Sequence, residues 1–313
     1  MNVLSLFDGI SCGRVALDRC GIAVKTYYAS EVDGNAIAVS QKNWPDIVQL
    51  GDVREVKGKD LPAIDLLIGG SPCQDLSIAK KERKGLDGDR SGLFWEYVRI
   101  WKECKPRWFI LENVASMSAK DRDTISEALG CEPVMVNAGL VSAQNRKRLF
   151  WTNIAFEMPA DRGIVLKDIL QDDADVEESM TMKGKAFCLT STYHKTGETQ
   201  SEYDHNKERR QRTMVRVGHI GSSNGQANRV YDVAGKSCTL SANGGGLGAK
   251  TGLYQTEGRI RKLTCVECER LQGLPDGYTE GIAKTNRYKA LGNAFNVEVV
   301  VAILRGVGAR ELP

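Results

Sequence analysis

Short apolar runs alternate with amphipathic stretches from residue 1 to about residue 155, and this alternation restricts the possible folds more than any other property of the chain. The apolar runs have the length and composition of buried strands, and the amphipathic stretches have the spacing of surface helices. The predicted strands are Asn2–Phe7, Val24–Ser30, Ile47–Gly51, Ile64–Gly69, Trp108–Asn113, Cys131–Asn137 and Arg148–Asn153; the predicted helices are Gly13–Cys20, Gly34–Asn43, Leu93–Cys104 and Ser118–Leu129. This order predicts an α/β domain with a doubly wound, mostly parallel sheet.

The composition changes near residue 160. Ten of the 32 glycines lie between Gly218 and Gly258, which disfavours helix and predicts a smaller domain of short strands and long loops. A helical pattern returns at Thr264–Gln272 and again, as one predicted helix, at Arg287–Arg305. We therefore predict a first domain at 1–159, a second at 160–262, and helices at 263–313 that return to the first domain.

Net charge, cysteine content and the length of the apolar runs bear on the class of protein and its partners. The net charge of +3 neither requires nor excludes a polyanionic partner. Nine cysteines, an odd number, make a disulfide framework unexpected, and the Cys265–Cys268 pair lies in a predicted helix without a second pair, so no metal site is expected. No apolar run reaches the roughly 18 residues of a membrane helix, and the N-terminus lacks the positive region of a secretion signal. A cytoplasmic protein without a membrane partner is expected.

Three consecutive strand ends carry hydrogen-bonding groups suited to a nucleoside. A glycine turn with the sequence Phe7-Asp8-Gly9-Ile10 follows the first strand, Glu31 follows the second, and Asp52 follows the third. Backbone N–H groups of such a turn approach a cofactor closely, and a carboxylate about 20 residues later can accept from ribose hydroxyls. Each feature alone is common, but their order favours a nucleoside cofactor.

The next two strand ends carry groups that could do chemistry. Cys73 follows Pro72 at the end of the fourth strand, where its thiolate could act as a nucleophile, although most cysteines are small buried hydrophobes. Glu112 ends the fifth strand, where a buried neutral acid could donate to a ring nitrogen; the alternative is an ordinary solvated glutamate. Arg146 and Arg148 are predicted to share one face of the following strand, and surface salt bridging is their alternative role.

The order of these motifs resembles the cytosine-C5 DNA methyltransferases. The resemblance covers nearly the whole chain except residues 160–258. It rests on Phe7-Asp8-Gly9, Ser30-Glu31-Val32, Gly51-Asp52-Val53-Arg54, Gly70-Ser71-Pro72-Cys73-Gln74, Glu112-Asn113-Val114, Gln144-x-Arg146-x-Arg148 and Leu291-Gly292-Asn293. The first domain most resembles the catalytic domain of the vertebrate de novo enzymes, and the glycine-rich second domain is similar to bacterial and phage enzymes.

The resemblance implies a covalent mechanism with S-adenosylmethionine as cofactor. Cys73 would add to C6 of cytosine, Glu112 would bond to N3, and Arg146 and Arg148 would hold the O2 side and the thiolate. The cofactor residues that the resemblance implies are Phe7, Asp8, Gly9, Ile10, Glu31, Asp52, Val53, Pro72 and Asn293.

The partner that the resemblance implies is double-stranded DNA, from which the target base must be flipped out. Lys80, Lys81, Arg83 and Lys84 follow Cys73 as a predicted basic lid over the DNA, and Arg229 and Thr239 are predicted DNA contacts of the second, target-recognition domain. A bacterial or phage-infected cell is the expected setting, and a cognate restriction nuclease is a further candidate partner.

Three other functions fit part of this sequence. An RNA cytosine methyltransferase uses the same chemistry, but this chain has Ser71-Pro72-Cys73 where those enzymes usually carry Pro-Pro-Cys. A DNA-binding homologue without catalysis would not need Cys73, Glu112 and the two arginines. A nicotinamide oxidoreductase would use the glycine turn and Glu31 but leaves Cys73 unexplained.

Overall fold

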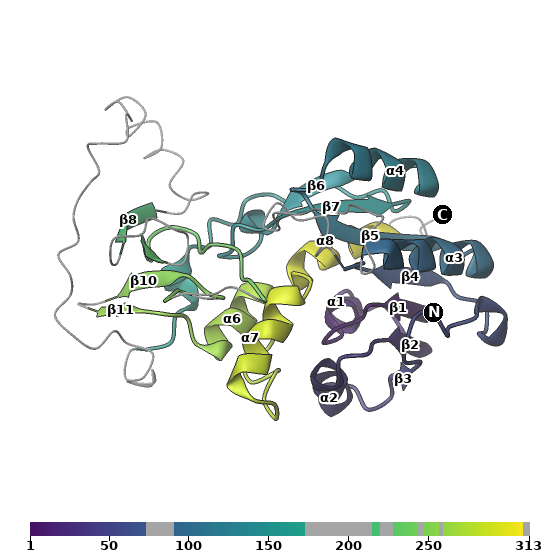
Figure 1. The fold of residues 1–313 in the computed structure, drawn as a ribbon, viewed down its shortest axis with the longest axis horizontal. Helices are drawn as coiled ribbons and strands as arrows, with labels where there is room; N and C mark the ends of the chain where they lie inside the picture. Colours follow the sequence, from purple (N-terminus) through teal and green to yellow (C-terminus); the bar gives the residue numbers. More distant parts are fainter. Residues whose placement is uncertain are drawn as a thin grey trace. The chain divides into compact units, whose positions relative to one another are not determined.

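The computed structural model describes residues 1–72, 91–172, 215–219, 228–242, 247–248, 250–256 and 259–308 (Figure 1). The chain divides into two compact units. Unit 1 comprises Met1–Asn137, Lys147–Met158 and Val297–Pro313, and unit 2 comprises Ala138–Arg146 and Pro159–Asn296.

Unit 1 is built on a seven-stranded sheet with the order β3-β2-β1-β4-β5-β7-β6. Its strands are β1 (Asn2–Leu6), β2 (Thr26–Ser30), β3 (Val48–Gln49), β4 (Leu66–Gly69), β5 (Trp108–Val114), β6 (Val134–Asn137) and β7 (Lys147–Thr152). The first five strands pair in parallel, and β7 runs antiparallel to β5 and β6. The predicted α/β class with a mostly parallel sheet is thereby confirmed.

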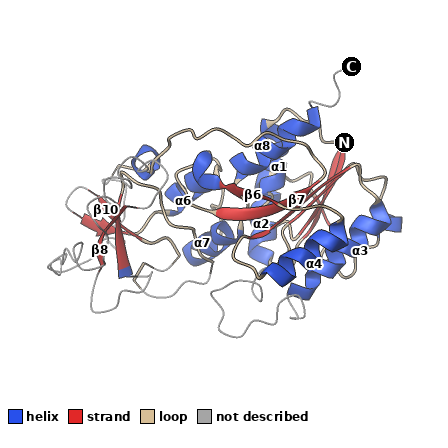
Figure 2. Ribbon diagram, turned by 90° about the horizontal axis from the view of Figure 1, so that it is seen from above, coloured by secondary structure: helices blue, strands red, loops and turns tan. Residues whose placement is uncertain are grey.

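Helices cover both faces of this sheet because alternate residues of each strand point to opposite sides. The helices of unit 1 are α1 (Cys12–Arg19), α2 (Gly34–Asn43), α3 (Phe94–Cys104), α4 (Ala119–Leu129) and α8 (Val297–Gly308). On one face Leu67 packs with α3 and α4, which Figure 2 shows lying close together. On the other face Ile68 meets Gly13 of α1, which in turn packs against α8.

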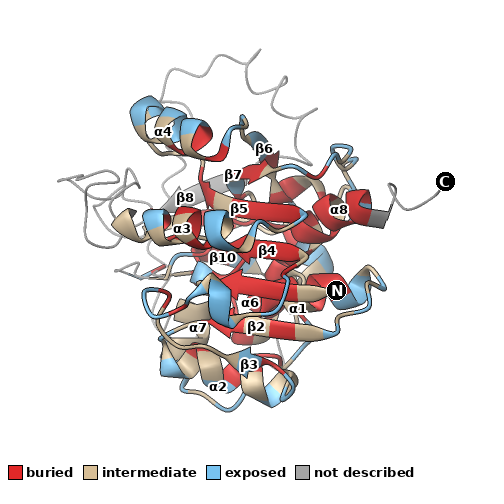
Figure 3. Cartoon of the chain, turned by 90° about the vertical axis from the view of Figure 1, so that its right-hand side faces the viewer, coloured by how far each residue is buried: buried red, intermediate tan, exposed pale blue. Residues whose placement is uncertain are grey.

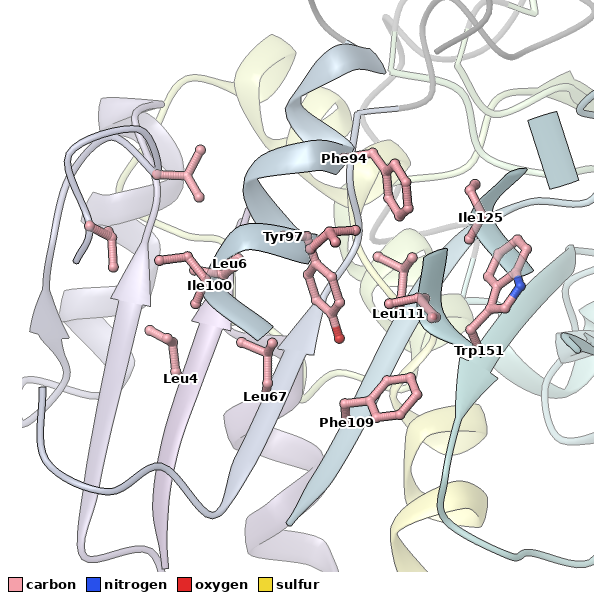
Figure 4. Close-up of a cluster of buried hydrophobic side chains, with 14 of the residues drawn as sticks. Leu4, Leu6, Leu67, Phe94, Tyr97, Ile100, Phe109, Leu111, Ile125 and Trp151 are labelled. Carbon is pink, nitrogen blue, oxygen red and sulfur yellow. The ribbon is translucent and has the colours of Figure 1, made fainter. Parts of the chain in front are cut away.

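The core of unit 1 lies between the sheet and α3 and α4. Figure 3 shows that β1, β4 and β5 are almost entirely buried. Figure 4 shows the cluster itself, whose side chains include Leu4, Leu6, Leu67, Phe94, Tyr97, Ile100, Phe109, Leu111, Ile125 and Trp151. Burial of this apolar surface fixes the strand order and therefore the edge at which the strand-end loops meet.

Unit 2 contains a four-stranded sheet with the order β11-β10-β9-β8. Its strands are β8 (Val215–His219), β9 (Arg229–Asp232), β10 (Leu253–Thr256) and β11 (Arg259–Arg261), and its helices are α6 (Cys265–Gln272) and α7 (Lys284–Asn293). Strands β9 and β10 are parallel, and the outer pairs are antiparallel. The short strands agree with the fragments expected from the glycine-rich composition, but the predicted recognition role of this region stays a prediction.

The prediction of one helix over Arg287–Arg305 is wrong. Helix α7 ends at Asn293 and α8 begins at Val297. Ala294 has an extended backbone (φ −64°, ψ 153°), and the side chain of buried Asn296 donates to the Leu271 carbonyl instead of facing solvent from a helix. Apolar spacing continues across this break, so periodicity alone could not reveal it.

Among the described residues, no single helix is long and apolar enough to cross a membrane. Taken together, Lys284–Asn293 and Val297–Val307 meet that test by length and composition only, as a bent pair.

Candidate active site

The turn after β1 has an unusual, left-handed backbone at the edge of the sheet. Phe7 (φ 57°), Gly9 (φ 60°) and Ser11 (φ 60°) are all left-handed, and α1 begins directly afterwards at Cys12. A Cβ added to Gly9 would meet no atom within 4 Å, so its φ and not a steric limit favours glycine there. The turn therefore leaves open space next to the N-terminus of α1, and a nucleoside site requires such a space.

Asp8 stabilises this turn from inside. Its carboxylate is buried and accepts hydrogen bonds from the Ser11 hydroxyl (2.5 Å) and the Tyr27 hydroxyl (2.8 Å). Burial raises the pKa of Asp8 to about 6, although the hydroxyl donors act in the opposite direction. Asp8 was predicted to bind a cofactor, but its side chain is buried inside the turn. Its partner Tyr27 was not predicted, because Tyr27 lies in a strand whose sequence pattern indicates only a buried apolar residue.

Glu31, at the end of β2, links the β1 turn to the start of α2. One carboxylate oxygen accepts from Gly9 N (2.8 Å), and the other accepts from Val32 N (2.7 Å) and Asp33 N (2.8 Å). A carboxylate offers about four acceptor positions, so one more donor can be accommodated. Next to it, Val32 is 70% exposed and offers an apolar surface.

The predicted residues after β3 are already engaged. Asp52 accepts from the Arg54 guanidinium through both oxygens, at 2.5 to 3.1 Å, and these hydrogen bonds lower the pKa of Asp52 to about 2. Val53 is buried in the core, and its carbonyl accepts from Arg99. Asp52 could bond to a ligand only if Arg54 turned aside.

The segment leading to Cys73 is fixed by Asn113 of β5. Asn113 Nδ2 donates to Ser71 Oγ (3.1 Å) and to the Ser71 carbonyl (3.3 Å), and its Oδ1 accepts from Val114 N. Both Ser71 and Asn113 are buried. Asn113 was not predicted as a functional residue, although it belongs to the Glu112-Asn113-Val114 motif. The described chain stops at Pro72, so Cys73 lies outside the described residues.

Glu112 and Arg148 form an ion pair beside this segment. In the register of β5 and β7, Glu112 lies opposite Phe150, so Arg148 is its diagonal neighbour. Arg148 Nε lies 2.8 Å from Glu112 Oε1, with side chains 16% and 13% exposed. Glu112 is thus paired with a guanidinium and has limited access to solvent, and its predicted role as an acid stays a prediction.

Arg146 and Arg148 do not share a face of a strand as predicted, because β7 begins only at Lys147. Arg146 belongs to unit 2, where its buried guanidinium donates to the carbonyls of Gly292 (3.3 and 3.4 Å) and Ala294 (3.0 Å). Asn293, the predicted cofactor residue between these two carbonyls, is exposed at the end of α7.

The predicted DNA contacts are only partly described. Lys80, Lys81, Arg83 and Lys84 lie outside the described residues. Arg229 begins β9, and Thr239 donates through its hydroxyl to the Asn145 carbonyl at 2.6 Å. In the described parts of the chain, no three His, Cys, Asp or Glu residues are grouped to hold a metal.

Comparisons with known proteins identify the family. The model of the C-5 cytosine-specific DNA methylase family matches residues 1–309. Type II methyltransferase M.HhaI of Haemophilus parahaemolyticus is 31% identical over 99% of this chain and 94% of its own length. Orphan methyltransferase M.SPRI of Bacillus phage SPR is 25% identical over 97% of both chains.

Solved structures share the fold. The Entamoeba histolytica methyltransferase EhMeth has a TM-score of 0.72 at 14% identity, covering 100% of this chain and 99% of its own. The Dnmt2 methyltransferase of S. pombe has a TM-score of 0.67 at 16% identity and full coverage of both chains. Since the family model spans almost all of the sequence and the sheet carries the family's motifs at its strand ends, this chain belongs to the C-5 cytosine-specific DNA methylase family.

Proposed function

We propose that the protein transfers a methyl group from S-adenosylmethionine to C5 of a cytosine flipped out of duplex DNA. The observation that carries this proposal is the edge of the unit 1 sheet where β1, β2, β4 and β5 end. In the order of the strands, that edge carries Glu31 after β2, Gly9 after β1, the Ser71–Pro72 segment after β4 and the Glu112–Arg148 pair near the end of β5. Ligands of open α/β sheets bind at the carboxyl ends of the strands.

The residues at β1 and β2 fit a nucleoside cofactor. The left-handed turn at Phe7 and Gly9 leaves space above the main chain, and Ile10 is buried beneath it. Glu31 keeps one acceptor position for a ribose hydroxyl, and exposed Val32 offers an apolar surface to an adenine ring. Bound there, S-adenosylmethionine would supply an electrophilic methyl group. Asp52, Val53, Pro72 and Asn293 complete the proposed cofactor set.

The reaction requires that cytosine C5 become nucleophilic. The Cys73 thiolate would add to C6, and the electron density would move to C5 as N3 gains a hydrogen bond or proton from Glu112. Arg148 would hold the Glu112 carboxyl group and the O2 side of the ring. Methyl transfer would leave S-adenosylhomocysteine. The C5 proton would then pass to solvent, the electrons of the C5–H bond would restore the C5–C6 double bond and expel the Cys73 thiolate, and N3 would return any proton to Glu112. Asn113 would keep the segment before Cys73 in place.

Binding of duplex DNA is assigned mainly to unit 2 and to the basic segment after Cys73. We propose that Lys80, Lys81, Arg83 and Lys84 close over the DNA backbone, and that Arg229 and Thr239 contact the DNA from unit 2. Arg146 is proposed to support the reacting base together with Arg148. Because the two relatives named above come from a bacterium and a phage, the proposed setting is a bacterial or phage-infected cell, with a cognate restriction nuclease as a proposed partner.

The experiment measures transfer of a labelled methyl group from S-adenosylmethionine to duplex DNA, with tRNA as the second substrate. The wild type should label DNA, and Cys73→Ser should abolish labelling, whereas Cys131→Ser, at a half-buried thiol whose pKa is raised by burial, should retain it. Glu112→Gln should lower kcat by about 10²–10⁴-fold, and Glu127→Gln on the exposed side of α4 should not. Labelling of tRNA without DNA would contradict the proposal and favour the RNA alternative.

A further inference from the structure

Lys236 is a charged side chain of unit 2 that the proposed mechanism does not use. It is 0% exposed. Lysines are almost never fully buried, because the ammonium group loses its hydration shell unless protein groups replace it. An apolar side chain of similar length would fill the same space without the cost of removing the ammonium group from water. The ammonium group therefore has a role beyond filling space.

The Lys236 ammonium joins two separate segments. Its Nζ donates to the Ser142 carbonyl at 3.0 Å and to the Ile164 carbonyl. Two main-chain hydrogen bonds also join these parts of the chain. Leu166 N donates to the Gly235 carbonyl, and Lys167 N donates to the Val233 carbonyl, both at 2.9 Å. Lys236 therefore lies where three stretches of unit 2 meet.

The residues after Lys236 form hydrogen bonds with one of these stretches. We call Lys236–Thr239 the clamp and Ser142–Arg146 the arginine segment. Ser237 N donates to the Ala143 carbonyl (2.8 Å), Asn145 N donates to the Ser237 carbonyl (3.0 Å), and the Thr239 hydroxyl donates to the Asn145 carbonyl (2.6 Å). With the Ser142 bond of Lys236, the clamp makes four hydrogen bonds to the arginine segment.

The arginine segment carries residues that the proposed reaction needs. It ends in Arg146, and its next two residues along the chain are Lys147 and Arg148, the latter paired with Glu112. Gln144, in the middle of the segment, is also 0% exposed and forms an isolated bridge with Ser237. A displacement of this backbone would be passed directly to Arg146, because Asn145, which the clamp contacts, is its neighbour in the chain.

We propose that Lys236 is a positioning residue for methyl transfer, which fixes the main chain of the arginine segment and thereby the placement of Arg146. The ammonium group supplies what an apolar side chain cannot, namely directional donors that reach carbonyls on two segments at once. This inference rests on the proposed function, since the arginines matter only if methyl transfer to DNA is the reaction.

The first test compares Lys236→Met with Lys167→Met. The first variant keeps an unbranched side chain and removes the ammonium; the second removes an exposed lysine whose backbone bond to Val233 stays. We expect kcat with duplex DNA to fall tenfold to a hundredfold, the effect of a small misplacement of catalytic groups, in Lys236→Met only. The Kd of S-adenosylmethionine, whose proposed contacts at the β1 turn and Glu31 do not involve the clamp, should stay within twofold by calorimetry.

Two further measurements separate positioning from stability. Amide hydrogen exchange should become faster at Asn145 and Ser237 in Lys236→Met, with no change in β1 and β4. In Lys236→Ala, added propylammonium, which matches the atoms removed, should restore part of kcat, and propanol should not. A kcat of Lys236→Met within twofold of the wild type would overturn the inference, as would loss of the native circular dichroism signal in both Lys236 variants.

The proposed function and this inference fail in different ways. If the wild type does not methylate DNA, the proposed function is wrong. Independently of activity, unchanged amide exchange at Asn145 and Ser237 in Lys236→Met would show that the clamp does not depend on Lys236. If the wild type and Lys167→Met are equally active and Lys236→Met matches them, only the inference is wrong.

Discussion

The two units place their polar side chains in opposite ways. In unit 1 the interior of the sheet is apolar, and the functional polar residues lie at or near strand ends, as Glu31 and Glu112 do. In unit 2 charged side chains are inside: Arg261 is 1% exposed, and Glu267 and Glu269 are 0% exposed. Burial of apolar side chains holds the large sheet of unit 1, so the polar residues at its edge are available for a ligand. In unit 2, with its short strands, buried charged side chains hold the loops together.

The pair of Arg261 and Glu267 illustrates the second strategy. Arg261 donates through two nitrogens to both Glu267 oxygens at 2.9 Å, and Glu267 also accepts from Thr264 N and Gln171 N. One carboxylate thus fixes the start of α6, strand β11 and the chain near residue 171. The bidentate geometry satisfies the buried charges.

Removing Glu267 is the strongest way to break this comparison. We expect Glu267→Ala to lower the free energy of unfolding by about 3–5 kcal/mol, because it leaves a buried guanidinium without its charge partner. Urea unfolding of the variant, with exposed Asp172→Ala as the control, measures the effect. A loss no greater than that of the control would mean that buried charge does not organise unit 2.

The matching test in unit 1 is Leu111→Ala. Leu111 is 0% exposed within the cluster between β5 and the helices. Deleting its buried methyl groups should cost about 2–5 kcal/mol in the same urea experiment, through lost transfer free energy and the cavity left behind. If unit 1 tolerated this change at below about 1 kcal/mol, apolar packing would not be its main source of stability.

Asp8 is an exception within unit 1, and its pKa gives a prediction for pH. The pKa is about 6 in the folded protein and 3.8 for the ordinary residue, so between these values the folded state binds more protons than the unfolded state. The free energy of unfolding should therefore fall as pH rises from about 4 to 6, by up to about 3 kcal/mol from this group. Asp8→Asn should lack this part of the slope.

Urea unfolding of the wild type and Asp8→Asn at a series of pH values isolates the contribution of Asp8, because the other titrating groups are common to both proteins. Parallel stability curves across pH 4 to 6 would show that Asp8 is not the buried acid described here.

The smallest effect is expected for the exposed pair of Arg54 and Asp52. Arg54→Gln should change stability by less than about 0.5 kcal/mol, because exposed ion pairs contribute little. It should, however, free Asp52 for a ligand, so calorimetry should find unchanged or tighter binding of S-adenosylmethionine. Weaker binding would remove Asp52 from the proposed cofactor set.

The sequence predicted unit 1 far better than unit 2. Alternating apolar runs identified the seven strands, with boundaries shifted by a few residues, because Leu67 and Leu111 have no stable place except a core. Motif order also located Glu31 and Glu112 at strand ends. The partners of these groups were beyond prediction: that Asp52 pairs with Arg54, or that Arg146 reaches Gly292, depends on side-chain direction and not on spacing.

In unit 2 the helical pattern predicted Thr264–Gln272, which agrees with α6, but the contacts of the loops had no comparable signal. Lys236 looks like an ordinary surface charge in the sequence, since burial of a charge is set by contacts between segments far apart in the chain. The break between α7 and α8 was missed for the same reason, because Asn296 leaves the helical pattern to bond with Leu271.

The most direct test of the account is covalent trapping on duplex DNA in which 5-fluorocytosine replaces every cytosine, so that no knowledge of the target sequence is needed. After methyl transfer, C5 of this base has no proton to lose, so the bond between Cys73 and C6 should persist. With S-adenosylmethionine the wild type should form a complex that survives denaturation and has the mass of protein, DNA and one methyl group. Cys73→Ser should form none, whereas trapping by Cys73→Ser at the wild-type level, or no trapping by the wild type, would contradict the account.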